Sequence, residues 1–327
     1  GLVGSEMCIR DRNPTLPFHK TGNGWQRNGN ASQIGPTEPL LFERNDEKNL
    51  TFNSHLQLSL QLTHNLHLAA LGSYSYTSTE NGRFAPTWVW AQGLAYRGER
   101  KTEDILGNIS LDWKYRWGIN KLSTTILAEY QKKKIAAFWT QVKGLTNNYF
   151  GYDNLGAASD RPYGGTGSSY ADPSLTSFMG TLTYTLLDRY TLNLTTRADG
   201  SSMVGKDHTW GIFPSISATW DMKKESFLRN NKSISLLNLR TGYGRSGNLG
   251  GISSYLTLRQ YIPVGLISYN GTPTVTMGTL RNSNPDLRWE TRSTFNIGTD
   301  LGLFNNRLLL TAEYYLSLIH ISEPTRP

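Results

Sequence analysis

Apolar and polar residues alternate with a period of two near the end of the chain. Between Leu287 and Leu303 the odd positions are apolar or uncharged, and every charged residue falls on an even position. After Asn305-Asn306 the alternation resumes, with apolar residues now at the even positions of 308–314. A period of two is typical of strands whose two faces meet different surroundings, so residues 287–315 are predicted to form an antiparallel hairpin.

The same alternation recurs in four earlier segments, at residues 50–76, 105–130, 178–198 and 212–243. Together with the last hairpin they predict about ten antiparallel strands. A soluble-protein strand is commonly about five or six residues long, whereas a strand tilted across a bilayer needs about 9 to 11. These segments have the longer length, which favours a transmembrane sheet with one face towards lipid.

Connections between the predicted strands alternate in length. Turns such as 63–65 and 187–189 are short, while the polar and aromatic segments 78–103, 131–174 and 247–285 are long. The connection at 222–232 is the one short-side segment of intermediate length. Short periplasmic turns and long external loops are typical of outer-membrane β-barrels. The predicted fold class is therefore all-β, a partial transmembrane antiparallel β-barrel.

Charged residues occupy the face opposite the apolar row in each predicted strand. One Arg or Lys facing lipid at the bilayer midplane costs about 2–4 kcal/mol, so the charged face is expected to line the lumen. The predicted lumen-facing charges are Asp112, Lys114, Arg116, Glu129, Arg197, Arg240, Glu290, Arg292, Asp300 and Glu313.

Composition narrows the class of protein. The chain has 327 residues, of which 37% are hydrophobic, and it contains no run of 18 apolar residues, which excludes helical membrane spans. The net charge is +8, but the basic residues are scattered among acids instead of clustered, so no nucleic-acid partner is expected. The single cysteine, Cys8, excludes an internal disulfide.

The two ends differ in character from the rest of the chain. Residues 1–12 and 316–327 resemble translated sequencing-adapter sequence, and both are expected to be artificial ends of an internal fragment. Residues 13–48 are rich in Gly, Asn, Pro and charge without a sustained period, and are predicted to be a loop region. Residues 49–315 are then the partial β-barrel.

Three segments carry a family resemblance. They are RADGSSMVGKDHTWGIFPSISATWDM (197–222), LLNLRTGYGRSGNLGGISSY (236–255) and the hairpin sequence from Asn284 to Tyr315. They resemble the barrel region of SusC/RagA-type TonB-dependent transporters of Bacteroidota. The resemblance implies a cell outer-membrane barrel of about 22 strands, of which this chain holds about ten. It also implies energised import of large nutrients, oligosaccharides or peptides.

The same resemblance implies partners. A SusD-like surface lipoprotein is expected as a lid, and the TonB-ExbB-ExbD system is expected to act through an N-terminal plug region outside this chain. Outer-membrane lipid is expected against the apolar face.

Aromatic residues in the predicted external loops are the candidate ligand contacts, because their flat apolar faces with polar rims stack on sugar rings and peptide side chains. The candidate substrate-binding residues are Trp88, Trp90, Trp139, Tyr149, Phe150, Tyr152, Tyr163 and Tyr170. No paired carboxylates stand out as catalytic, and His64 and His67 are expected to be solvated turn residues and not metal ligands. No enzymatic activity, metal or cofactor is expected.

Two alternatives remain open at this point. A passive porin or structural outer-membrane barrel would share the strand pattern but lack a plug and a TonB-interacting segment. A secreted β-rich glycan-binding protein, with its strands in a sandwich or solenoid, would be soluble without detergent.

Overall fold

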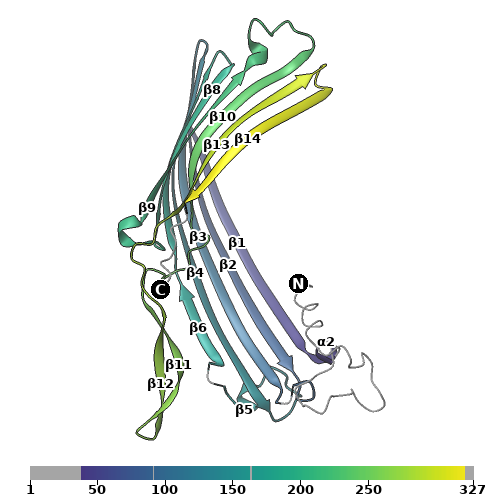
Figure 1. The fold of residues 1–327 in the computed structure, drawn as a ribbon, viewed down its shortest axis with the longest axis vertical. Helices are drawn as coiled ribbons and strands as arrows, with labels where there is room; N and C mark the ends of the chain where they lie inside the picture. Colours follow the sequence, from purple (N-terminus) through teal and green to yellow (C-terminus); the bar gives the residue numbers. More distant parts are fainter. Residues whose placement is uncertain (1–37, 91, 163, 321–327) are drawn as a thin grey trace.

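A single curved antiparallel sheet dominates the computed structural model, which describes residues 38–90, 92–162 and 164–320 (Figure 1). The short helix α2 (Glu38–Phe42) precedes it. Ten strands follow one another across the sheet in chain order: β1 (Arg44–Thr63), β2 (Leu66–Ala85), β3 (Leu94–Trp117), β4 (Asn120–Leu145), β7 (Ser174–Leu186), β8 (Tyr190–Ser201), β9 (Trp210–Asp221), β10 (Ile234–Asn248), β13 (Glu290–Leu303) and β14 (Leu308–His320). The predicted all-β fold is confirmed, and the sheet is open, with β1 and β14 at its edges.

The remaining elements lie within the long connections. Strands β5 (Ala158–Asp160) and β6 (Thr166–Ala171) pair with the far part of β4. Strands β11 (Gln260–Tyr269) and β12 (Thr272–Arg281) form a separate two-stranded hairpin. The short 3-10 helices are η1 (Leu155–Ala157), η2 (Lys206–His208) and η3 (Met222–Lys224).

Short turns lie at one rim of the sheet and long connections at the other, as predicted. The turns are built from residues in the left-handed region of φ, among them Gly118 (φ 53°), Asp188 (φ 57°) and Asn306 (φ 61°). Glycine adopts this region without a steric penalty, and Asn and Asp adopt it more readily than other residues. In Figure 1 the short-turn rim is the upper end, and β5, β6 and the β11–β12 hairpin lie towards the lower end.

Several predicted boundaries were wrong because strands continue where the hydrophobic alternation stops. β1 begins at Arg44, so residues 44–48 belong to the sheet and not to the predicted loop region 13–48. Most of the predicted loop 78–103 is strand, since β2 reaches Ala85 and β3 begins at Leu94. Likewise β4 runs to Leu145, well into the predicted loop 131–174. In these parts apolar residues do not alternate regularly with polar ones, so the period of two that marks the belt is lost.

The ends of the chain are described only in part. The predicted artificial segment 1–12, most of the predicted loop region 13–48, and residues 321–327 lie outside the described residues. Residues 316–320, which belong to the other predicted artificial segment, continue strand β14 in pairing with β13.

Strands β1 to β4 thus extend beyond their neighbours at the long-loop rim. We call residues 44–49, 77–85, 94–104 and 133–145 of these strands the outer extension. Its residues Phe84, Ala95 and Val142 form a small hydrophobic core together with Ala158 of β5. Leu145, Tyr152 and Leu155 pack against this core, so the segment after β4 folds back onto the extension.

Candidate functional site

The strand register gives the sheet two distinct faces. Asp112 lies opposite Thr125, Glu129 opposite Ser177, and Arg240 opposite Gly298. Because directly opposed residues point to the same face of a sheet, the register can be followed from strand to strand. It places ten predicted charges together on what we call the polar face: Asp112, Lys114, Arg116, Glu129, Arg197, Arg240, Glu290, Arg292, Asp300 and Glu313.

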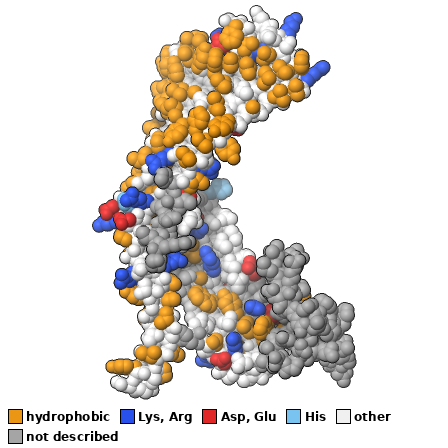
Figure 2. Space-filling model, viewed as in Figure 1, with side chains coloured by type: hydrophobic (Ala, Val, Ile, Leu, Met, Phe, Trp, Pro, Cys, Tyr) orange, Lys and Arg blue, Asp and Glu red, His pale blue; other side chains and the backbone are white. Residues whose placement is uncertain are grey.

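The other face, the belt face, carries large apolar side chains that are exposed. They include Leu58, Ile109, Ile126, Leu194 and Ile216. Figure 2 shows apolar side chains gathered over the upper part of the sheet, towards the short-turn rim. A continuous apolar surface of this kind needs an apolar surrounding, and the strand lengths match a bilayer. We call this apolar part of the belt face the belt.

The belt ends at a defined level on strands β1 to β4. Its last residues towards the long-loop rim are Leu50, Tyr76, Ile105 and Tyr130, all at least partly exposed. Beyond this level the belt face carries charge, for example Lys101 and Lys134, which lie near Glu99 and Glu103 respectively. The outer extension is therefore a water-facing wall that projects from the belt.

Two charge clusters lie on the polar face at the level of the belt, around Arg197 and Arg240. Arg197 contacts Asp199 at 2.7 Å, Glu129 at 3.2 Å and the hydroxyl of Ser177 at 2.9 Å. Arg240 lies against Asp300, with N–O distances of 2.9 and 3.1 Å. Removing one partner would leave a partly buried charge without compensation, which is more costly than the pair itself is favourable.

Aromatic rings line the belt face near the short-turn rim. Trp113, Tyr115 and Trp117 stack along β3 with centroid distances of 5.7 and 5.4 Å. Tyr190 stacks on Trp220 at 6.0 Å. Amphipathic rings of this kind favour the level where hydrocarbon meets water.

One carboxylate from the β9–β10 connection contacts this aromatic rim. Glu225 accepts hydrogen bonds from Tyr190 (2.6 Å) and Trp220 (3.1 Å), and Arg189 donates to its other oxygen. These contacts, the hydrogen bond from Tyr190 foremost, hold the pKa of Glu225 below its usual range. The intermediate-length connection at 222–232 is thus held against the aromatic rim by hydrogen bonds.

The candidate aromatic contacts that the structure describes come from the long-loop end, and these seven do not converge on one pocket. Trp88 packs edge-on against Phe42, and Trp90 donates a hydrogen bond to Glu43. The ring centroids of Tyr149 and Phe150 are 5.1 Å apart, and Tyr149 is 89% exposed. Tyr163 lies outside the described residues.

Two of the predicted loop aromatics belong to strands instead. Trp139 is in β4 and Tyr170 in β6. Trp139 lies on the polar face of the outer extension, with its ring over Gly167, where any side chain would collide with it. Tyr96, which sequence reasoning missed, lies on the same face, with the hydroxyl end of its ring over Gly98. Both aromatic side chains therefore lie over a glycine on the polar face.

Tyr96 also borders a hollow of about 480 Å³ on the outer extension, lined by Asn45, Asp46, Glu47, Asn81, Gly82, Arg83, Tyr96 and Gln141. Amide, carboxylate and guanidinium groups beside an aromatic ring can bind a polar solute by hydrogen bonds and stacking. No sequence signal marks this hollow, because its residues come from four strands separated by up to about a hundred positions.

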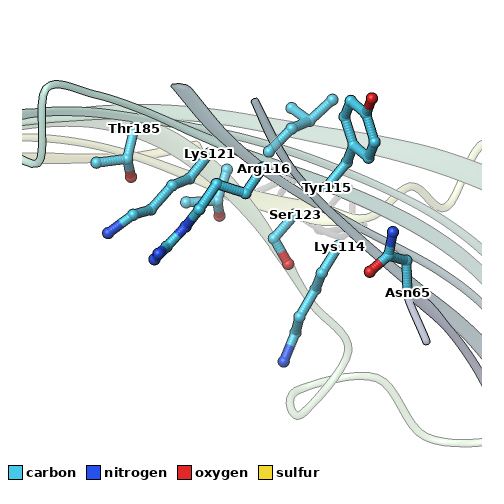
Figure 3. Close-up of a pocket in the computed structure, with 9 residues that line it drawn as sticks. Asn65, Lys114, Tyr115, Arg116, Lys121, Ser123 and Thr185 are labelled. Carbon is cyan, nitrogen blue, oxygen red and sulfur yellow. The ribbon is translucent and has the colours of Figure 1, made fainter. Parts of the chain in front are cut away.

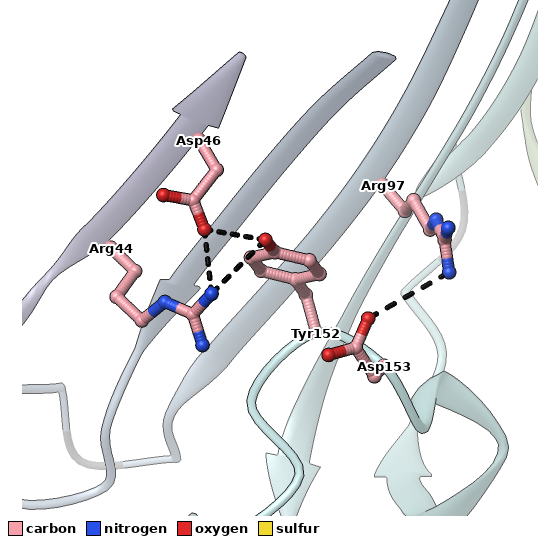
Figure 4. A network of polar contacts seen from close by, with 5 residues as sticks. All are labelled: Arg44, Asp46, Arg97, Tyr152 and Asp153. Atoms are coloured by element: carbon pink, nitrogen blue, oxygen red, sulfur yellow. Dashed lines mark hydrogen bonds and ion pairs between the residues drawn. The ribbon is translucent and has the colours of Figure 1, made fainter. Parts of the chain in front are cut away.

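Tyr152 is held by contacts within the protein. Its hydroxyl donates to Asp46, and the guanidinium carbon of Arg44 lies 5.0 Å from its ring centroid (Figure 4). The hydrogen bond to Asp46 raises the pKa of Tyr152. Its ring covers Gly82, where a side chain would collide with it. Nearby, Asp153 lies 3.9 Å from Arg97. These contacts anchor the segment after β4 to the extension.

Cationic side chains gather on the polar face at the short-turn rim. Lys114, Arg116 and Lys121 border a hollow of about 270 Å³. Their charged ends extend on one side of the sheet while Tyr115 points to the other (Figure 3). Lys121 pairs with Asp188, and this contact lowers the pKa of Asp188, with Arg116 and Lys224 adding to the effect.

The described residues contain neither a metal-binding cluster nor a helix that could span a membrane. Within residues 38–90, 92–162 and 164–320, no three His, Cys, Asp or Glu side chains are grouped so that they could hold a metal ion. No helix in this part of the chain has the length and apolar character to cross a membrane.

Relatives of known sequence match most of the chain. It is 30% identical to TonB-dependent receptor P3 of Formosa agariphila over 92% of its length, and 34% identical to receptor P26 of the same organism over 96%. It is 38% identical over 144 residues to TonB-dependent receptor SusC of Bacteroides thetaiotaomicron. The chain spans about a third of the length of receptors P3 and P26, 30% and 32% respectively.

A solved structure shares the fold. The RagAB peptide transporter superposes with a TM-score of 0.77 at 20% sequence identity, over 90% of this chain and 33% of the transporter chain. The family described as TonB dependent receptor-like, beta-barrel, matches residues 10–319. With its exposed belt, its opposite charged face and its alternating rims, the chain belongs to this family of outer-membrane β-barrels and is of the SusC/RagA type.

Proposed function

We propose that the chain forms part of the wall of a transporter that imports large nutrients, oligosaccharides or peptides, across the outer membrane. The observation that carries this proposal is the two-faced sheet, with an exposed apolar belt on one side and paired charges on the other. In this proposal the belt meets lipid, and the ten charges of the polar face line the lumen. The family membership and the receptor and transporter names of the relatives support it.

The proposed partners act at opposite rims. A SusD-like surface lipoprotein would meet the long-loop rim, where the outer extension projects beyond the belt. The TonB-ExbB-ExbD system would supply energy from the short-turn side through a region of the protein outside this chain. The function is one of binding and transport, without a catalytic step or cofactor.

Solute contacts are assigned to the long-loop end. Trp139 and Tyr96 present flat rings on the polar face of the extension, and Trp88, Trp90, Tyr149, Phe150 and Tyr170 lie around it. We include Tyr163 on its position in the sequence alone. Tyr152 contributes indirectly, because it holds the segment that carries Tyr149 and Phe150.

Uptake by cells carrying the full-length protein tests the proposal. A strain that expresses it should accumulate its nutrient only while TonB is present, and deletion of TonB should abolish uptake with the protein still in the outer membrane. Uptake that persists without TonB would favour a passive porin. A protein that is soluble without detergent would favour the secreted glycan-binding alternative.

A second measurement addresses the solute contacts. Trp139→Ala with Tyr96→Ala in the full-length protein should raise the solute concentration needed for half-maximal uptake about tenfold, since each stacking ring contributes about 0.5–1.5 kcal/mol. The matched control is Trp113→Ala with Tyr115→Ala, two rings of the belt face. Equal effects of the two double variants on that concentration would contradict the assignment.

A further inference from the structure

Two arginines of the polar face at the level of the belt have carboxylate partners, whereas two cations at the short-turn rim have none in the part of the chain that the structure describes. Arg197 and Arg240 each contact carboxylates within 3.2 Å. Among the described residues, by contrast, neither Lys114 nor Arg116 has a carboxylate within 4 Å, and Lys121 has only Asp188. The rim therefore holds an excess of positive charge.

The strand register places these positive charges close together, so they repel one another. Arg116 lies directly opposite Lys121 on the neighbouring strand, and directly opposed side chains have Cβ atoms about 4.5–5.5 Å apart. Lys114 is two residues from Arg116 on the same face, about 7 Å along the strand. Like charges directly opposite each other destabilise a sheet, so an anion that lies among them gains from all three.

Neutral donors complete the hollow between these cations. Ser123 lies opposite Lys114, and Thr183 and Thr185 follow on β7. Asn65, from the β1–β2 turn, borders the other side. Hydroxyl and amide groups beside cationic ends can donate to several oxygens of one group, and hydrogen bonds to an ionised acceptor are the stronger kind.

We propose that Lys114, Arg116 and Lys121 form a binding site for an anionic group, a carboxylate, sulfate or phosphate, carried by the transported molecule. The proposal rests on the import function proposed above, and it names the substrate class: the solute is anionic. A lining of three cations and several neutral donors suits an oxyanion with several acceptor oxygens. The site lies where a solute would leave the barrel on the short-turn side.

Binding at this site is electrostatic and reversible. The ammonium and guanidinium ends are exposed or half-exposed, so water screens them and a bound anion can depart again. A solute group would be drawn down the lumen from the paired charges of the belt to the unpaired cations at the rim.

Thermal unfolding of the full-length protein in detergent tests the site, with inorganic phosphate as the probe. Phosphate replaces chloride at constant ionic strength. The wild type should show a midpoint that rises with phosphate concentration and saturates. Lys114→Gln with Arg116→Gln should weaken the apparent phosphate affinity at least tenfold. The control, Lys132→Gln with Lys134→Gln, removes two positive charges beyond the belt and should leave the titration unchanged.

Two results would overturn the proposal. One is a flat phosphate titration of the wild type, which is also the outcome expected if an acidic segment of the protein fills the hollow. The other is an equal loss of response in the control variant. TonB-dependent uptake with a flat titration would remove the anion site and leave the import function standing, whereas uptake that ignores TonB would remove the import function itself.

Discussion

Strands β1 to β4 run through both the belt and the outer extension, and yet the same face of these strands has a different chemistry in each region. In the belt this face is apolar and exposed, as at Ile109 and Ile126. In the extension it holds charge, and it is partly covered by the chain's own segment after β4. Backbone pairing continues through both regions without a break from Leu94 to Trp117 of β3. The surroundings of the face, and not the strand pairing, therefore determine its residues.

This difference separates two sources of stability. The belt needs lipid, because its apolar side chains have few protein neighbours on that face. The extension needs its own packing, because water surrounds it on both sides. The same kind of substitution should therefore change the free energy of unfolding by different amounts in the belt and in the outer extension.

The largest effect is expected from a charge placed in the belt. Ile126 and Phe138 both point to the belt face of β4 and are 59% and 52% exposed. Ile126→Arg should lower the free energy of unfolding of the full-length protein in lipid vesicles by about 2–4 kcal/mol. Phe138→Arg, in the extension, should change it by about 0.5 kcal/mol. Denaturant titration measures both, and similar costs would break the comparison.

A smaller effect is expected on the polar face at the level of the belt. Arg197→Gln leaves Asp199 and Glu129 without their cation, and should cost about 1–3 kcal/mol. The matched variant Arg292→Gln removes an exposed cation that donates to a single hydroxyl, Ser317, and should cost about 0.5 kcal/mol at most. The same denaturant titration decides, and an Arg197→Gln protein as stable as wild type would contradict the role given to the cluster.

The extension should respond to a loss of packing without any change in the belt. Val142 is 4% exposed in the small core. Val142→Ala removes two buried carbon groups and should lower local stability by about 1–2 kcal/mol. Hydrogen exchange should become faster in residues 146–160 and stay unchanged in β7 and β8. Val275→Ala, at an exposed position of β12, is the control, and unaltered exchange in residues 146–160 would show that this core does not hold the extension.

The smallest effect is expected at the opposite rim and depends on pH. The pKa of Glu225 is lowered from its usual 4.5, so its contribution to stability is present above that value and is lost as pH falls through the folded-state pKa. Unfolding of the full-length protein from pH 6 to pH 3 should therefore show a shallower acid-induced loss in Glu225→Gln. The control Glu80→Gln, in the extension, should retain the wild-type profile. Identical pH profiles for all three proteins would mean that the contacts of Glu225 do not contribute to stability.

The belt was predictable from the sequence, and the extension was not. Residues such as Leu58 and Ile126 alternate with polar neighbours because lipid and water lie on opposite sides, and that contrast is written in the sequence with a period of two. In the extension water lies on both sides, so Thr77 to Gly82 carry no such contrast and were taken for a loop.

The candidate site was predictable only in its general location. Trp139 and Tyr170 were recognised as aromatic residues of the long-loop end but were assigned to loops. The contact of Tyr152 with Asp46 joins residues 106 positions apart, and no local pattern announces such a contact. The cations Lys114 and Arg116 were assigned to the polar face, but their lack of partners became visible only when the register set Arg116 opposite Lys121.

The central claim is that the belt face meets lipid up to Tyr130 on β4 and water beyond it. Spin labels placed singly at residues 126, 128, 134 and 138 of the full-length protein in vesicles test this most directly, by their collision rates with oxygen and with a water-soluble nickel complex. Labels at 126 and 128 should collide mainly with oxygen, and labels at 134 and 138 mainly with nickel. Oxygen-dominated collisions at all four positions, or nickel-dominated collisions at 126 and 128, would contradict the account.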